Sequence, residues 1–120
     1  MKKELFHISM TNNTTSEDYK TIGNYDENEI EFYESDKLKS RIYFNLNSKK
    51  LIKENIDYKI EIDFSLERET ECLIILKKEE RELRLKVKTL EYRFENNELF
   101  LLYNIIDNEE FITYKISIGG

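Results

Sequence analysis

A chain of 120 residues is long enough for one hydrophobic core but not for two, so we expect a single domain over residues 1–120. Its 8 tyrosines and 7 phenylalanines argue against intrinsic disorder, and a net charge of −6 with interleaved signs argues against a nucleic-acid partner. No apolar run reaches the length of a membrane span, and the N-terminal residues lack an export signal, so we expect no membrane partner and a cytoplasmic location.

The first half of the chain alternates apolar and polar residues in short segments. A period of two is typical of β-strands. The alternating apolar positions are Phe6, Ile8 and Met10; Ile30 and Phe32; Ile42, Phe44 and Leu46; and Tyr58, Ile60, Ile62, Phe64 and Leu66. Between them, residues 12–18 and 23–29 concentrate Asn, Asp, Ser, Thr and Gly and predict loops.

Residues 69–94 are open to two interpretations. The segment is rich in Glu, Lys, Arg and Leu, which favour a helix, and several of its apolar residues fit a heptad pattern. We favour strands, because the heptad leaves Cys72, Leu85 and Tyr92 off the apolar stripe. A β-bulge at Lys88-Thr89 would keep the apolar residues before and after it on the inward face.

Two tight turns determine the arrangement expected for the last third. Asn96-Asn97 suits a type I′ hairpin, which needs positive φ at both residues, and a second two-residue turn is expected at Asn108-Glu109. Both turns direct the same side of the middle strand inward. The expected rows of facing residues are Leu90–Tyr103–Tyr114, Tyr92–Leu101–Ile116 and Phe94–Leu99–Ile118.

These elements predict an all-β fold, an antiparallel up-and-down meander that closes into a barrel of about eight or more strands. An open sheet with a helix on one face is the alternative.

Two segments, KVKTLEYRFENNELFLLYNI and the closing YKISI, carry a resemblance to a known family. Over about residues 28–118 the chain resembles the YwiB-like family of small bacterial proteins of unknown function. That family is similar to calycins, the lipocalin-type barrels, so the resemblance implies a calycin-like β-barrel and no established catalytic residues. The chain departs from the family at residues 77–80, where a glycine-containing turn is usual, and in its N-terminal third.

The sequence offers little for catalysis or metal binding. The one histidine, His7, alternates away from Phe6 and Ile8 and is expected at the surface, and Cys72 is expected to be buried and inert. The acidic segment 26–31 lacks the glycine of a calcium loop. We therefore expect no catalytic residues, no metal and no cofactor, and keep a hydrolase or isomerase that uses His7 or buried carboxylates as a third alternative.

Two functional hypotheses remain from different classes. If the barrel is hollow, Tyr92, Leu101, Tyr103 and Tyr114 would line a cavity for a small apolar or amphipathic ligand. If the core is filled, Phe100 and Leu102 on the outer face of the same strand would mark a contact surface for another protein. The stems of Arg93, Ser117, Glu91 and Lys115 could shield that pair instead. Whether the chain forms a homo-oligomer stays open.

Overall fold

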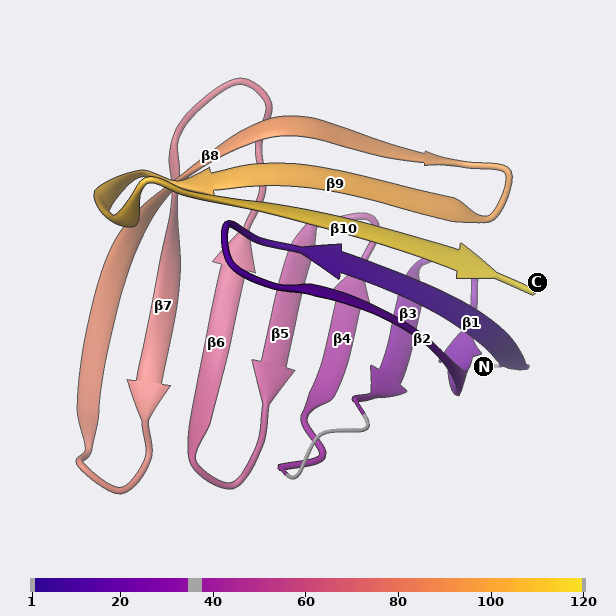
Figure 1. Cartoon of the computed structure of the whole chain (residues 1–120), viewed down its shortest axis with the longest axis horizontal. Helices are drawn as coiled ribbons and strands as arrows, with labels where there is room; N and C mark the ends of the chain where they lie inside the picture. The colour runs from indigo at the N-terminus through magenta and orange to yellow at the C-terminus, as the bar shows by residue number, and fades with distance from the viewer. Residues whose placement is uncertain (1, 35–37, 120) are drawn as a thin grey trace.

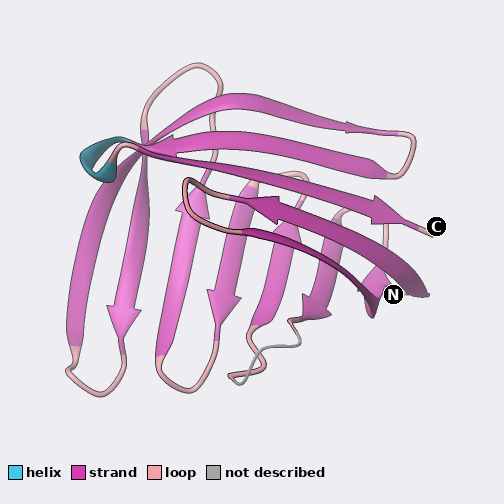
Figure 2. Ribbon diagram, in the orientation of Figure 1, coloured by secondary structure: helices cyan, strands magenta, loops and turns pink. Residues whose placement is uncertain are grey.

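The computed structural model describes residues 2–34 and 38–119. Within them the chain forms ten antiparallel strands that close into a barrel, in the order β1-β10-β9-β8-β7-β6-β5-β4-β3-β2 (Figures 1 and 2). The strands are β1 (Lys2–Thr11), β2 (Ser16–Tyr25), β3 (Glu29–Tyr33), β4 (Arg41–Asn45), β5 (Lys50–Glu54), β6 (Tyr58–Asp63), β7 (Thr70–Leu76), β8 (Arg81–Glu95), β9 (Glu98–Ile105) and β10 (Glu110–Ile118). The predicted all-β meander barrel is confirmed, and the helical interpretation of residues 69–94 is wrong.

The barrel is flattened into two layers that cross each other. In Figure 1, β9, β10, β1 and β2 run across β3 to β7. Strand β8, 15 residues long, belongs to both layers, because its first half pairs with β7 and its second half with β9. The inner faces carry the buried core, which includes Phe6, Phe32 and Phe44.

The bulge in β8 exists, but it lies one residue beyond the predicted position. Thr89 pairs with Tyr103 and Glu91 with Leu102, so Leu90 is the extra residue and is 39% exposed. Thr89 takes the inward place, where its hydroxyl accepts a hydrogen bond from the backbone N–H of Ser65 at 3.2 Å. The predicted Leu90–Tyr103 pair is therefore wrong, because the inward position suits a threonine that has a partner.

The first predicted hairpin is confirmed and the second is shifted. Asn96 and Asn97 have φ of 51° and 57°, and Phe94 faces Leu99. In the second hairpin a 3₁₀ turn, η1 (Ile106–Asn108), and a left-handed residue lengthen the loop. Leu101 consequently faces Tyr114 instead of Ile116. A shift of two residues preserves the face, so the inward set of β10 is the predicted one.

Strand β2 was not predicted, because its residues include many loop formers. It pairs with β1 along its whole length but with β3 only through Asn24 and Tyr25. Gly23 directly precedes the residues that pair with β3, and close packing requires a glycine there. A Cβ at this position would lie 2.5 Å from the carbonyl oxygen of Glu31 and 2.4 Å from the Phe6 ring. Glycine thus lets β3 approach β2 and close the barrel.

Candidate functional site

A cavity of about 270 Å³ lies between the two layers at the end of the barrel where the β1–β2 and β9–β10 loops meet. Its walls are mostly apolar and come from β5, β6, β7 and β8 on one side and from β1, β9 and β10 on the other. Asn13 ties the two loops together, since its side-chain amide donates to the backbone oxygen of Glu109 at 3.0 Å and its amide oxygen accepts from the Phe111 N–H at 3.2 Å. These two hydrogen bonds join loops that are far apart in the sequence and fix them beside each other at the rim of the cavity.

Two of the predicted tyrosines line this cavity. Tyr103 is 3% exposed, and Tyr114 packs against the core. Burial is the main reason that the pKa of each hydroxyl lies well above its usual value of 10.0, and the charges of Cys72 and Glu110 add to the shift at Tyr103. Both hydroxyls are thus neutral hydrogen-bonding groups at physiological pH.

These two hydroxyls are also available. Neither hydroxyl forms a hydrogen bond with a protein group in the described parts of the chain. No unpartnered polar atom is completely buried there, so both hydroxyl oxygens are partly accessible. They therefore border open space, which in this place is the cavity. A polar group on an otherwise apolar wall is the feature that orients a small molecule in a binding site.

The other two predicted residues lie elsewhere in the interior. Leu101 is 1% exposed and sits between Tyr92 and Tyr114 in the sheet, and neither it nor Tyr92 is among the residues that line the cavity. The Tyr92 ring stacks on Phe44 at 6.0 Å between centroids, and its hydroxyl donates to the Leu46 carbonyl at 3.4 Å. Burial raises the pKa of Tyr92 to about 12.

Aromatic packing separates the two halves of the interior. Phe44 stacks on Phe64 at 6.2 Å, and Phe64 in turn packs against Tyr103 at 5.0 Å, so a row of rings runs from Tyr92 to the inner boundary of the cavity. Tyr92 and Tyr103 therefore lie at the two ends of one aromatic row, and of the four predicted residues Tyr103 and Tyr114 line the cavity.

Phe100 and Leu102 lie on the outer face, each covered in part by its neighbours. The Arg93 guanidinium lies 5.0 Å from the centre of the Phe100 ring, with Lys115 on its other side. Leu102 stands between Glu91 and Thr113. Ser117, expected as a shield, instead faces Glu98 and donates to its carboxylate at 3.1 Å, as the two-residue shift of β10 requires.

His7 lies on the outer face and does not form a catalytic arrangement. Its Nε2 is 2.5 Å from Asp18 Oδ1, and the Ser9 hydroxyl donates to the other oxygen of the same carboxylate at 2.9 Å. These two hydrogen bonds lower the pKa of Asp18. Nucleophilic catalysis needs the serine to donate to the histidine, and here both bind the carboxylate.

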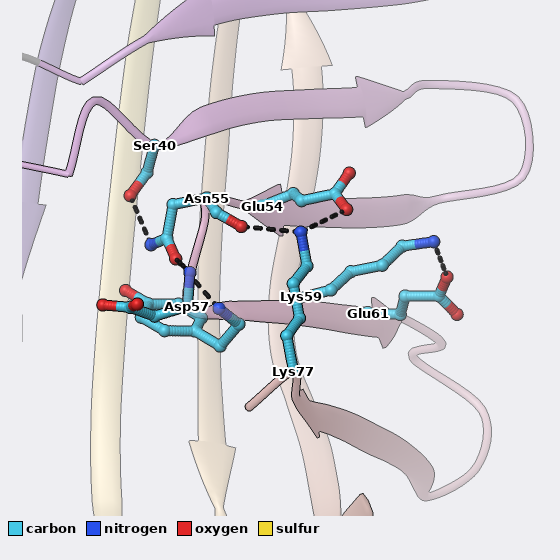
Figure 3. Close-up of polar contacts among 8 residues, drawn as sticks. Ser40, Glu54, Asn55, Asp57, Lys59, Glu61 and Lys77 are labelled. Carbon is cyan, nitrogen blue, oxygen red and sulfur yellow. Dashed lines mark hydrogen bonds and ion pairs between the residues drawn. The ribbon is translucent and has the colours of Figure 1, made fainter. Parts of the chain in front are cut away.

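A second polar cluster stabilises the β5–β6 hairpin and offers no chemistry of its own. Asn55, which is buried, donates to the Ser40 hydroxyl at 3.0 Å and accepts from the backbone N–H groups of Asp57 and Tyr58 at 2.9 Å each (Figure 3). The Lys77 ammonium donates to the backbone carbonyl oxygen of Asn55 at 2.7 Å and pairs with the carboxylate of Glu54. The side-chain oxygen of Asn55 accepts two backbone N–H groups of the turn, which is typical of an Asx turn, and its amide nitrogen holds the neighbouring Ser40.

Metal binding finds no support among residues 2–34 and 38–119, where no three potential ligands of the His, Cys, Asp or Glu type cluster. Cys72 is buried on the cavity wall. Burial raises the pKa of its thiol to about 11, so the reactive thiolate is scarce at neutral pH.

The sequence did contain a signal for the polar rim, which was not recognised. Lys53 shares the inward face of β5 with Leu51, and Glu110 shares the inward face of β10 with Ile112. Both line the cavity, together with Asn12 and Asn108. A charged residue at an inward position near a strand end marks the mouth of such a space.

No helix in the described part of the chain combines the length and the apolar character that crossing a bilayer requires.

No protein-family model and no curated protein sequence matches the chain. In fold it is similar to the crystal structure of the YwiB protein from Bacillus subtilis, with a TM-score of 0.57 over 98% of this chain and 92% of that one, at 13% sequence identity. Likeness at this identity concerns the fold alone, and it confirms the expected YwiB-like fold.

Proposed function

We propose that the protein binds a small apolar or amphipathic ligand in the cavity between its two layers, without catalysing a reaction on it. The observation that carries this proposal is the pair of hydroxyls, Tyr103 and Tyr114, that face an apolar cavity without a protein partner among the described residues. Apolar walls supply affinity by burying the ligand, and a few fixed polar groups orient it.

The volume restricts the size of the ligand. A cavity of about 270 Å³ exceeds the roughly 150 Å³ that takes up benzene and lies just below the ~300 Å³ at which common ligand pockets begin. The ligand we propose is therefore larger than a single ring and smaller than a lipid with a long chain.

The same proposal extends to the relationship and setting of the protein. We propose that the chain is a distant bacterial member of the YwiB-like family, with a calycin-type barrel, acting in the cytoplasm on a small molecule and not on nucleic acid or membrane. The shared fold and the matching segments within residues 28–118 support the relationship.

Native mass spectrometry tests the ligand function. Protein purified gently is compared with its denatured mass, and 1-octanol is added as a probe. Ile112→Phe places a ring at the cavity wall, and Ile56→Phe makes the same change at a site that is 76% exposed. We expect an adduct in the parent and in Ile56→Phe that is lost in Ile112→Phe. An absence of both a co-purified adduct and octanol binding would refute the proposal.

A second candidate, an interaction module, is supported by the open edge of β2. Beyond Asn24 and Tyr25 this edge has no second strand among the described residues, and Ile22 on it is 61% exposed. We propose a second copy as the partner, because antiparallel pairing of two β2 strands about Tyr19 sets Asp18 opposite Lys20 of the other copy, twice. Concentration-dependent dimer mass, abolished by Lys20→Asp, would support it, and a monomer at every concentration would refute it.

A further inference from the structure

The polar groups of the cavity differ in how well they are satisfied. Lys53 is the one cation among the described residues that line the cavity. Its ammonium lies 3.3 Å from the Glu34 carboxylate, with 23% and 12% of the two side chains exposed. A ligand anion would therefore have to compete with Glu34 for this ammonium. Partly buried ion pairs are not readily exchanged, because either charge loses its partner.

Glu110 presents the opposite situation. Its side chain lies on the inward face of β10 with Ile112 and Tyr114, it lines the cavity, and it makes no ion pair with any of the described residues. Its charge reaches Tyr103, and the charges of Glu34 and Glu17 reach Tyr114. Glu110 is thus a carboxylate on the cavity wall for which no counter-ion is found among the described residues.

A cation is the group that such surroundings recognise. A carboxylate without an ion-pair partner can accept a charge-assisted hydrogen bond from an ammonium or guanidinium group. The net charge of −6 on the whole chain favours the approach of cations over anions.

We infer that the ligand is an amphipathic cation, whose apolar body fills the cavity and whose ammonium or guanidinium group binds the Glu110 carboxylate at the mouth. The inference rests on the proposed ligand function and gives the ligand its chemical class. Glu110 positions the charged group, while Tyr103 and Tyr114 supply hydroxyls to the part of the ligand inside.

Three probes with the same apolar chain and different head groups distinguish the contribution of the ligand's charge to affinity from that of its apolar body. The affinities of n-octylamine, 1-octanol and n-octanoate are measured by calorimetry at pH 7 for the parent, Glu110→Gln and Glu79→Gln. Glu79→Gln removes the same charge from an exposed turn far from the cavity lining, so it controls for the net charge of the protein. We expect octylamine to bind roughly tenfold more tightly than octanoate.

Glu110→Gln should weaken octylamine about tenfold and leave octanol unchanged, which also shows that the variant is folded, whereas Glu79→Gln should change neither. Octanol binding as tightly as octylamine, octanoate binding most tightly, or equal losses in both variants would overturn the inference while the ligand function stands. Binding of none of the three probes would overturn the ligand function itself.

Discussion

The single cysteine reports directly on the cavity wall. Cys72 is 2% exposed, and burial raises the pKa of its thiol from 9.0 to about 11. A rise of two units lowers the thiolate fraction at pH 7.5 by about 100-fold, and the thiolate is the form that reacts with alkylating reagents. We therefore expect iodoacetamide to modify the folded protein about 100-fold more slowly than the unfolded chain.

The assay follows the mass increase of the intact protein at pH 7.5, with the same chain in guanidinium as the reference. The rate in the folded protein should rise about tenfold for each pH unit up to near pH 11, whereas the reference should level off near pH 9. Folded and unfolded rates within tenfold of each other would refute the account of Cys72 as a buried wall residue.

A bound molecule should slow the reaction further, because Cys72 lines the cavity. Saturating octylamine should lower the rate in the parent but not in Ile112→Phe, where the ring occupies the space. A small denaturant addition that accelerates the reaction strongly would show that it proceeds through unfolding. In that case, protection by ligand would report stabilisation and not occupancy of the wall.

Three further predictions concern stability. Gly23→Ala should lower the unfolding free energy by about 1–3 kcal/mol in urea titrations, since the added Cβ meets the buried Phe6 ring and a backbone oxygen; an unchanged midpoint would contradict the close approach of β3. Asn97→Val should cost roughly 1–2 kcal/mol because valine tolerates φ of 57° poorly, while Asn97→Gly should not destabilise, and equal midpoints would argue against the turn. The hydrogen bond from Lys77 is the main cause of the lowered pKa of Glu54, so the ionised Glu54 stabilises the fold above pH 4.5, and this stabilisation is lost as pH falls through the lower folded-state pKa. Glu54→Gln should therefore make the melting temperature less dependent on pH in that acid range. A melting temperature that depends on pH as steeply as in the parent would refute this prediction.

Alternation predicted the inward side of β9 and β10, and of β8 apart from Leu90 at the bulge. Tyr114 was placed opposite the wrong residue, yet its inward direction was right, because pairing errors of two residues leave the face unchanged. The β9–β10 loop could not be read from the sequence, since a 3₁₀ turn and a two-residue turn use similar residues.

The spacing of apolar residues alone does not locate the bulge in β8. The change of parity between Val87 and Leu90 predicts a bulge at Lys88-Thr89, but a buried threonine with a hydrogen-bond partner is acceptable inside and leaves Leu90 outside. Strand β2 was not predicted for a related reason. It forms because it pairs with β1 along its whole length, and the intrinsic propensities of its own residues do not indicate a strand.

The position of the cavity follows from the same competition between packing and polarity. Toward Tyr92 the inward positions of the facing strands carry rings that stack on one another, as Phe44 does on Phe64. Toward the β9–β10 loop the inward positions include the charged residues Lys53 and Glu110. Charged residues are costly at inward positions, and a fold that needed only stability would have placed apolar residues there. The two tyrosine hydroxyls that have no protein partner in the described chain belong to residues that line the cavity at this end of the barrel, which is where we propose that the ligand binds.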